Sequence, residues 1–349
     1  MLVKHTLCAA VLLAISAATA QAQQAAPANC ATLKQVAAIK LEQIADGRWL
    51  VPISINGVSK KMILDTSAVA SSIFSDYATE TNMTLTDALP SAAPPPAAAP
   101  GGRGGPPGGG RGGPGAPVKL ASITSFGLGT IVSGAGYFKV APDARKDKAL
   151  DPNLIGVLGT DLLWSYDFDL DFGTKTLSLF SADHCPGKVV YWSGPTVAVS
   201  FYVDTKGQLR FPVLVDGTEL SGTLNSAAAQ NGMSLVFGKK KLGFHETDAG
   251  FDKVATDGVQ PAQYSHRFKS VDLGGLAVNN PLIFVNDDSK TNKIQVTNAA
   301  ATHSTIMDTT IPDVVLGAPF MGKFHLYVET KEHMIYVTPA EPAKKASTD

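Results

Sequence analysis

One turn in the chain carries a residue type and setting that could support acid–base chemistry. Asp65 follows the apolar residues Ile63 and Leu64 and precedes Thr66 and Ser67, so it stands at a turn after a predicted strand. A carboxylate held in this way can act as a general acid or a general base. The same pattern is also typical of an Asx-type turn, in which the Asp side chain only caps the strand.

The segment before Asp65 has a counterpart much later in the chain. Val51 to Gly57 and Phe211 to Gly217 are both β-prone runs that contain a proline. Each run ends in a turn pair that favours a type I′ hairpin. These pairs are Asn56-Gly57 and Asp216-Gly217. A second strand is predicted after each pair, over Lys61 to Leu64 and over Thr223-Leu224.

The second copy differs from the first at the residue that could do chemistry. Counted from Pro52 and Pro212, Asp65 and Asn225 lie at the same offset. Ser226 and Ala227 follow Asn225 in the chain. The position that holds a carboxylate in the first copy therefore holds an amide in the second.

Two further blocks repeat in the same order. Gly156-Val157-Leu158-Gly159 matches Val314-Val315-Leu316-Gly317, and both are followed by an apolar helix start and two short strands. Between these blocks, Ile123 to Val132 resembles Val271 to Val278. Three matched blocks at similar spacing indicate an internal duplication and predict two similar lobes.

These motifs resemble those of aspartic peptidases of the retropepsin and pepsin kind, in particular retropepsin-like proteins that bacteria export. The resemblance rests on Asp65-Thr66-Ser67 and on Gly156 to Gly159 about ninety residues later, and it covers roughly residues 46 to 181. Residues 208 to 338 share it more faintly. It implies an all-β fold of two β-barrel lobes with pseudo-twofold symmetry, in which Thr66 supports the Asp65 turn by hydrogen bonds across the lobe interface.

The chemistry of that family needs two carboxylates that share one proton. One activates a water while the other, protonated, donates to the carbonyl oxygen of the peptide bond. Ser67 replaces the glycine of the family's turn, and Asn225 replaces the second aspartate. An amide cannot share a proton with Asp65, so the pair of carboxylates that this chemistry needs is incomplete.

The second carboxylate has three other conceivable sources. Asp308 lies too close to Leu316 in the sequence, and Asp216 belongs to the hairpin turn before the strand. A homodimer could pair Asp65 of two chains, but the second lobe would have to be displaced, so a monomer is favoured. The predicted function is an exported aspartic-peptidase-like protein that hydrolyses peptide bonds if active. The alternatives are an inactive relative that binds extended peptides, and an envelope interaction protein.

The N-terminus and the charge balance bear on location and partners. Residues 1–22 have a short basic start, an apolar run and A-x-A sites, which is typical of a secretory signal peptide and predicts a periplasmic or secreted protein. No later stretch is apolar enough for a transmembrane helix. With 29 basic and 30 acidic residues, the chain is not expected to bind nucleic acid. The expected partner is a peptide or protein.

Two cysteines remain after the predicted signal peptide. Cys30 and Cys185 are expected to form a disulfide in an oxidising compartment, which would tie the N-terminal segment to the end of the first lobe. Two unpaired buried thiols are the alternative.

The predicted organisation follows from the repeats and from composition. It comprises a segment over residues 23–45, a first lobe over 46–192 and a second, degenerate lobe over 196–339. The segment 23–45 is either a strand of an interlobe sheet or a leader. Residues 91–117 are almost all Pro, Gly and Ala and are expected to be a disordered insertion, and residues 340–349 a disordered tail. Short helices are predicted over Ser71 to Glu80 and Leu162 to Ser165.

The remaining motifs predict neither a metal nor a cofactor. The histidines show no metal-ligand spacing, and no phosphate loop or dinucleotide fingerprint is present. His325 alternates with Phe324 and Leu326 and is therefore expected to face outward.

Overall fold

The fold is all-β and two-lobed, as predicted, with one ten-stranded sheet in each lobe. The computed structural model describes residues 30–87, 118–142, 151–254, 261–292, 294–297, 303–306 and 311–340, without the side chains of 294–297 and 303–306. The predicted signal peptide, residues 91–117, Asp308 and the tail beyond residue 340 lie outside this part. Among the described helices, none is long and apolar enough to cross a membrane.

The first lobe holds the Asp65 turn. Its sheet has the order β6-β7-β10-β5-β11-β4-β3-β8-β9, with β2 paired to β3. The strands are β2 (Glu42–Gln43), β3 (Trp49–Ile55), β4 (Val58–Leu64), β5 (Ser72–Phe74), β6 (Leu85–Asp87), β7 (Lys119–Ile123), β8 (Phe126–Leu128), β9 (Ile131–Ser133), β10 (Gly136–Ala141) and β11 (Leu154–Leu158). Two short helices, α1 (Ser75–Glu80) and the 3-10 helix η1 (Thr160–Leu162), lie close to the two predicted helices.

The second lobe repeats this arrangement strand for strand. Its order is β19-β20-β23-β18-β26-β17-β16-β21-β22, with β15 paired to β16. The strands are β15 (Tyr202–Val203), β16 (Leu209–Val215), β17 (Thr218–Asn225), β18 (Gly232–Ser234), β19 (Asp252–Val254), β20 (Gln263–Arg267), β21 (Ser270–Leu273), β22 (Leu276–Asn279), β23 (Leu282–Asn286) and β26 (Val314–Gly317). Helices α2 (Leu235–Leu242) and α3 (Ala318–Met321) complete the lobe, and a separate hairpin pairs β24 (Ile294–Thr297) with β25 (His303–Ile306).

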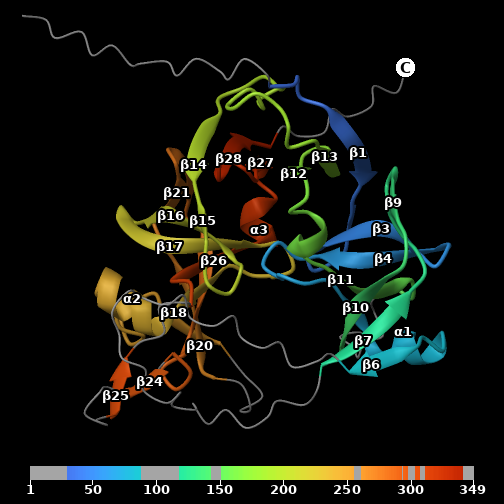
Figure 1. The fold of residues 1–349 in the computed structure, drawn as a ribbon. Coiled ribbons are helices and arrows are strands. Elements are labelled where there is room, and N and C mark those ends of the chain that lie inside the picture. Colours follow the sequence, from blue (N-terminus) through green and yellow to red (C-terminus); the bar gives the residue numbers. More distant parts are fainter. Residues whose placement is uncertain are drawn as a thin grey trace, which may run out of the picture.

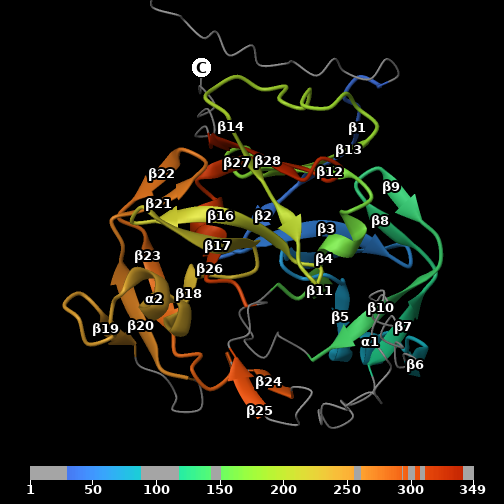
Figure 2. The ribbon, with the colours of Figure 1, turned by 60° about the vertical axis from the view of Figure 1, so that its left-hand side comes forward.

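A third sheet joins the lobes and runs across the top of the molecule in Figures 1 and 2. Its order is β1-β13-β12-β27-β28-β14. Its strands are β1 (Gln35–Lys40), β12 (Asp167–Asp171), β13 (Thr176–Phe180), β14 (Val197–Ser200), β27 (Phe324–Glu329) and β28 (Met334–Pro339). The segment 23–45 therefore contributes a strand to the interlobe sheet, which was one of the two predicted alternatives.

The burial of the strands follows from their sequences. In β16, Phe211, Val213 and Val215 are buried while Pro212 and Leu214 are exposed, which is the period-two pattern of a strand with one covered face. Every residue of β27 is buried, because it lies in the middle of the shared sheet.

The hairpin turns have the predicted conformation. The φ angles of Asn56 and Gly57 are 50° and 78°, and those of Asp216 and Gly217 are 49° and 80°. Positive φ at both central residues defines the type I′ turn.

Candidate functional site at the lobe junction

Asp65 lies directly after β4, and its turn holds the carboxylate in place. Its backbone N–H donates to the carbonyl oxygen of Leu158 in β11 at 2.9 Å. Its Oδ1 accepts from the Ser67 amide (2.8 Å), the Ser67 hydroxyl (2.7 Å) and the Ala68 amide (3.1 Å). All three donors use Oδ1, so with respect to the described residues the half-buried carboxylate keeps Oδ2 for a water or a ligand.

Asn225 ends β17 and occupies the matching turn of the second lobe. Its Oδ1 accepts from the Ala227 amide at 3.0 Å, as Oδ1 of Asp65 accepts from the Ser67 amide. The Ala228 amide closes the turn onto the Asn225 carbonyl at 3.1 Å. The two turns therefore share one backbone design. Asp65 and Asn225 differ in the charge and the donor that they offer, and only Asp65 accepts from a side-chain hydroxyl within its turn, that of Ser67, among the described residues.

The two turns are joined by hydrogen bonds between Thr66 and Ser226. The Thr66 amide donates to Oγ of Ser226 (3.1 Å), and the Ser226 amide donates to Oγ1 of Thr66 (3.2 Å). Each hydroxyl also donates to the strand of the other lobe, Thr66 to the Leu224 carbonyl (3.0 Å) and Ser226 to the Leu64 carbonyl (2.6 Å). The support that the family resemblance implied for Thr66 is therefore present, and Ser226 provides it in return.

Each turn is packed against a glycine at the end of a neighbouring strand. The Gly159 amide donates to Oγ of Ser71 at 2.9 Å, and the Gly317 amide donates to Oδ1 of Asn231 at 3.0 Å. A Cβ atom at Gly159 would lie 2.7 Å from the Ala68 carbonyl oxygen. These strand ends therefore approach the turns so closely that only glycine fits.

A turn of the second lobe braces the Asp65 turn from one side. Gln208 donates through Nε2 to the Ser67 carbonyl at 3.2 Å, and Arg210 holds Gln208 by a 3.1 Å hydrogen bond to Oε1. Nε of Arg210 also donates to Asp204 at 2.8 Å. Burial alone would raise the pKa of Asp204, but hydrogen bonds from the Gln208 amide, Arg210 and the Lys206 amide outweigh burial and lower it.

The described carboxylates offer no substitute for the missing one. Oδ1 of Asp216 accepts from the Ser270 amide at 2.9 Å in its hairpin turn, away from the junction as predicted. Asp161 is engaged by the amide and the hydroxyl of Ser71, at 2.9 Å and 2.6 Å. Within the described residues, Asp65 is therefore the one carboxylate that the two turns present.

The structure contains the predicted disulfide between Cys30 and Cys185, which are 155 residues apart in the sequence. Backbone hydrogen bonds support it: the Ala31 amide donates to the Asp183 carbonyl (3.1 Å) and the Cys185 amide to the Ala31 carbonyl (3.0 Å). The bond attaches the segment before β1 to the loop after β13.

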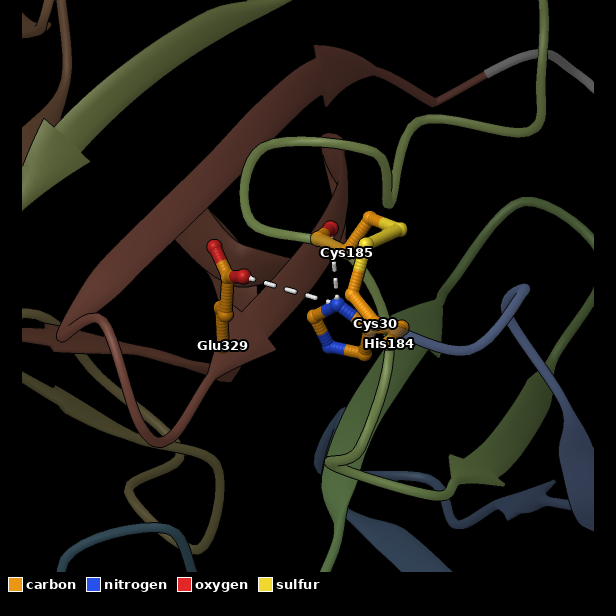
Figure 3. The surroundings of a disulfide bond; sticks show 4 residues. All are labelled: Cys30, His184, Cys185 and Glu329. Carbon is orange, nitrogen blue, oxygen red and sulfur yellow. Dashed lines mark hydrogen bonds and ion pairs between the residues drawn. A yellow bond between two sulfur atoms is a disulfide. The ribbon is translucent and has the colours of Figure 1, made fainter. Parts of the chain in front are cut away.

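A second group of titratable residues, which the sequence did not reveal, lies beside this disulfide (Figure 3). It comprises Asp167, His184 and Glu329, whose potential ligand atoms all lie within 4.8 Å of one another. Burial, followed by the nearby Glu332 carboxyl, raises the pKa of Glu329 to about 7. Burial alone would lower the pKa of His184, but the hydrogen bond to Asp167 and the surrounding negative charges raise it. Glu329 is distant in the sequence from Asp167 and His184, so no local spacing could have indicated the group.

The expectation for His325 was wrong. Its side chain is buried, and Nε2 lies 2.6 Å from Oδ1 of Asp169. His325 faces Asp171 across the β12–β27 pair, and the Trp192 ring packs against its imidazole with 4.2 Å between ring centroids. A strand covered on both faces has no outward side, so alternation with apolar neighbours could not reveal its environment.

No protein-family model matches the chain, and a search of curated proteins finds no relative. Among solved structures, it is similar to basic 7S globulin from soybean, with 11% identity over 88% of this chain and 95% of that chain and a TM-score of 0.42. It is also similar to conglutin gamma, a basic 7S globulin from lupine seeds, with 12% identity over the same shares and a TM-score of 0.44. Likenesses this weak define neither the family nor the function of the chain.

Proposed function

We propose that the protein is an aspartic-peptidase-like protein that binds extended polypeptide at the junction of its lobes without cleaving it by a two-carboxylate mechanism. The observation that carries the proposal is the position of Asn225. It occupies the turn that matches the Asp65 turn, within a frame of Thr66 and Ser226 hydrogen bonds that is complete. This arrangement supports the interpretation of a two-carboxylate frame in which one of the two carboxylates has been replaced.

The chemistry of the two side chains favours binding over hydrolysis. Ionised Asp65 only accepts hydrogen bonds, whereas Asn225 can both donate and accept. An extended peptide offers alternating N–H and C=O groups, which such a pair can engage. Hydrolysis would need a proton held between two carboxylates, and an amide cannot hold it.

A homodimeric peptidase is disfavoured by the same hydrogen bonds. Pairing Asp65 with Asp65 of another chain would require Thr66 to exchange its bonds to Ser226 and Leu224 for bonds to a second Thr66 turn. These bonds are made within one chain, so a monomer is the proposed state.

The proposed compartment is the periplasm or the exterior of the cell. The predicted leader over residues 1–22 and the disulfide between Cys30 and Cys185 support it, because disulfides persist in oxidising compartments.

The test uses fluorescently labelled casein, an unfolded protein, from about pH 3 to about pH 7, the range in which carboxylate dyads work. The wild-type protein is compared with Asp65→Ala and Asn225→Asp, and both cleavage and binding, measured by fluorescence anisotropy, are followed. We expect the wild type to bind without cleaving, Asp65→Ala to bind more weakly, and Asn225→Asp to gain cleavage.

Two results would overturn the proposal. Cleavage by the wild type that disappears in Asp65→Ala would establish a peptidase and require a second carboxylate. Absence of both binding and cleavage in the wild type and in Asn225→Asp would leave an interaction protein whose junction has no peptide-binding role.

A further inference from the structure

The buried group beside the disulfide is assembled by the shared sheet and the loop after β13. Asp167 begins β12 and Glu329 ends β27, and the antiparallel pairing of Phe168 with Val328 brings them opposite each other one residue further on. His184 precedes Cys185 in the loop. The side chains of Asp167 and Glu329 are 0% exposed and that of His184 is 4% exposed.

Asp167 fixes the orientation of the His184 ring. It accepts hydrogen bonds from the Thr330 amide and hydroxyl, both at 2.8 Å, from the Tyr327 hydroxyl at 3.1 Å, and from Nε2 of His184. The Thr330 amide can only donate, and two hydroxyls also point at Asp167, so we assign the proton between Asp167 and His184 to Nε2 of the ring. The other ring nitrogen, Nδ1, faces the Cys185 carbonyl oxygen and Glu329, and a cation bound there would take the place of its proton.

Nδ1 of His184 is turned toward two oxygen acceptors (Figure 3). It lies 3.1 Å from the Cys185 carbonyl oxygen and 3.8 Å from Oε1 of Glu329. Neither carboxylate oxygen of Glu329 accepts a hydrogen bond of good geometry from the described residues, although both are buried and the Tyr336 hydroxyl and the Glu332 carboxyl lie near them. A buried carboxylate without a donor is strongly unfavourable unless a proton or a cation neutralises it. The space between Nδ1 and Glu329 offers a place for such a cation.

The lysine that lines this pocket does not supply that charge. Lys331 lines the same pocket, but its Nζ pairs with Asp183 at 2.7 Å, and both side chains are largely exposed. Glu332, at the mouth of the pocket, adds a further negative charge. Among the described residues around Glu329, acidic side chains therefore outnumber basic ones.

We propose that His184 Nδ1 and the Glu329 carboxylate bind a divalent cation of the zinc class, with Glu332 and water as the outer ligands. Zinc takes nitrogen and oxygen ligands at about 2.0–2.1 Å, so that two ligand atoms lie roughly 3.4 Å apart. The 3.8 Å between Nδ1 and Oε1 is close to this separation. Asp167, on the opposite ring nitrogen, is the positioning residue, in the carboxylate–histidine–metal arrangement that is common at metal sites.

A pocket gives the cation access to the site. It has a volume of about 500 Å³, and Cys30, Asp183, His184, Glu329 and Glu332 are among its lining residues. A bound ion would link the disulfide-bearing loop to the end of β27, and so to the seam between the lobes. The proposed site is structural and independent of the Asp65 turn.

The experiment is calorimetric titration of Zn²⁺ into purified, chelator-treated protein with its disulfide intact, at neutral pH. The variants are His184→Gln and Glu329→Gln, and the matched controls are His245→Gln and Glu219→Gln, which replace exposed residues. We expect one ion per chain in the wild type and in both controls. Each site variant should bind at least about tenfold more weakly, and excess Zn²⁺ should raise the melting temperature of the wild type by a few degrees.

A second measurement covers the case in which a site variant does not fold. Co²⁺ added to the wild type should broaden the imidazole NMR signals of His184 and leave those of His245 unchanged. The proposal is overturned if the wild type binds no Zn²⁺, if both site variants bind as tightly as the controls, or if Co²⁺ leaves His184 unaffected. In those cases a proton on Nδ1 would be the group that meets Glu329.

Discussion

Thr66 and Ser226 each donate a backbone hydrogen bond to the side-chain hydroxyl of the other. They stand at matching positions of the duplicated sequence and belong to different lobes. The spacing and orientation of the Asp65 and Asn225 turns therefore depend on two hydroxyl groups.

Replacing Thr66 by Val should weaken this junction. The change keeps the shape of the side chain but leaves the Ser226 amide and the Leu224 carbonyl without the partner that they have in the wild type. Each unsatisfied buried group costs about 1–3 kcal/mol, so we expect unfolding in urea to show a loss of about 2–4 kcal/mol. Thr86→Val, at an exposed position of β6, is the control. Equal stabilities of the two variants would contradict the role given to the hydroxyl.

Replacing Asp204 by Asn should destabilise the protein in a pH-dependent way. Asp204 and Arg210 are 9% and 2% exposed, and loss of one partner of such a pair costs about 3 kcal/mol. The pKa of Asp204 is lowered in the folded state. Its stabilising effect is therefore complete above the unfolded pKa of about 3.9 and is lost as the pH falls through the folded pKa.

The difference between wild type and Asp204→Asn should accordingly be largest near neutral pH and shrink in acid. Asp46→Asn is the matched control, because Asp46 pairs with Arg48 in a turn of the first lobe where the two side chains are 38% and 21% exposed. Such a pair contributes less than about 1 kcal/mol. Parallel pH profiles of the two variants, measured by thermal unfolding, would refute this assignment.

Gly317→Ala should disrupt the second-lobe turn. The added Cβ would lie 2.3 Å from the Gln230 carbonyl oxygen, a backbone atom that cannot rotate away. We expect a loss of about 3 kcal/mol or more, seen as a lower melting temperature or a poor yield of folded protein. In Gly136→Ala the nearest atom is a side-chain carbon of Ile123 at 3.9 Å, so this control should keep wild-type stability. A Gly317→Ala protein as stable as the control would contradict this prediction, because it would show that the turn shifts to accommodate the added Cβ.

Removing the disulfide should loosen the N-terminal strand first. A double variant with Ala at Cys30 and Cys185 no longer closes a loop between positions 155 residues apart, which should lower the free energy of unfolding by about 2–5 kcal/mol. Hydrogen exchange should accelerate in β1, which pairs only with β13 among the described strands. Unchanged exchange in β1 would mean that the strand is held by its sheet contacts alone.

The duplication and the strand pattern could be predicted because they leave local signals. These signals are the alternating apolar residues, the two type I′ turn pairs and the repeated glycines around Gly159 and Gly317. Each of them reflects the local structure of a single lobe. The equivalence of Asp65 and Asn225 followed from counting residues between such signals. The matching strand orders of the two lobes bear this out.

The shared sheet and the buried ionisable groups could not be predicted in the same way. The pairing of β1 with β13 joins segments that are far apart in the sequence, and the pairing of β12 with β27 depends on how the two lobes meet; no local pattern indicates either. His325 and Glu329 lie on a strand covered on both faces, where polar residues are tolerated because Asp169 or His184 lies near them. Such partners are set by tertiary structure and are distant in sequence.

The order of the shared sheet bears on whether the two lobes need to be covalently connected. On one side of the seam lie β1, β13 and β12, and on the other lie β27, β28 and β14, so among the described strands of this sheet only the β12–β27 pair connects the two halves. A cut at the connection around residues 193–195 leaves each half with its own ten-stranded sheet, and the disulfide stays within the first half. We therefore expect two separately synthesised fragments, ending at Trp192 and beginning at Thr196, to assemble as a heterodimer through the β12–β27 pair and the Thr66–Ser226 hydrogen bonds.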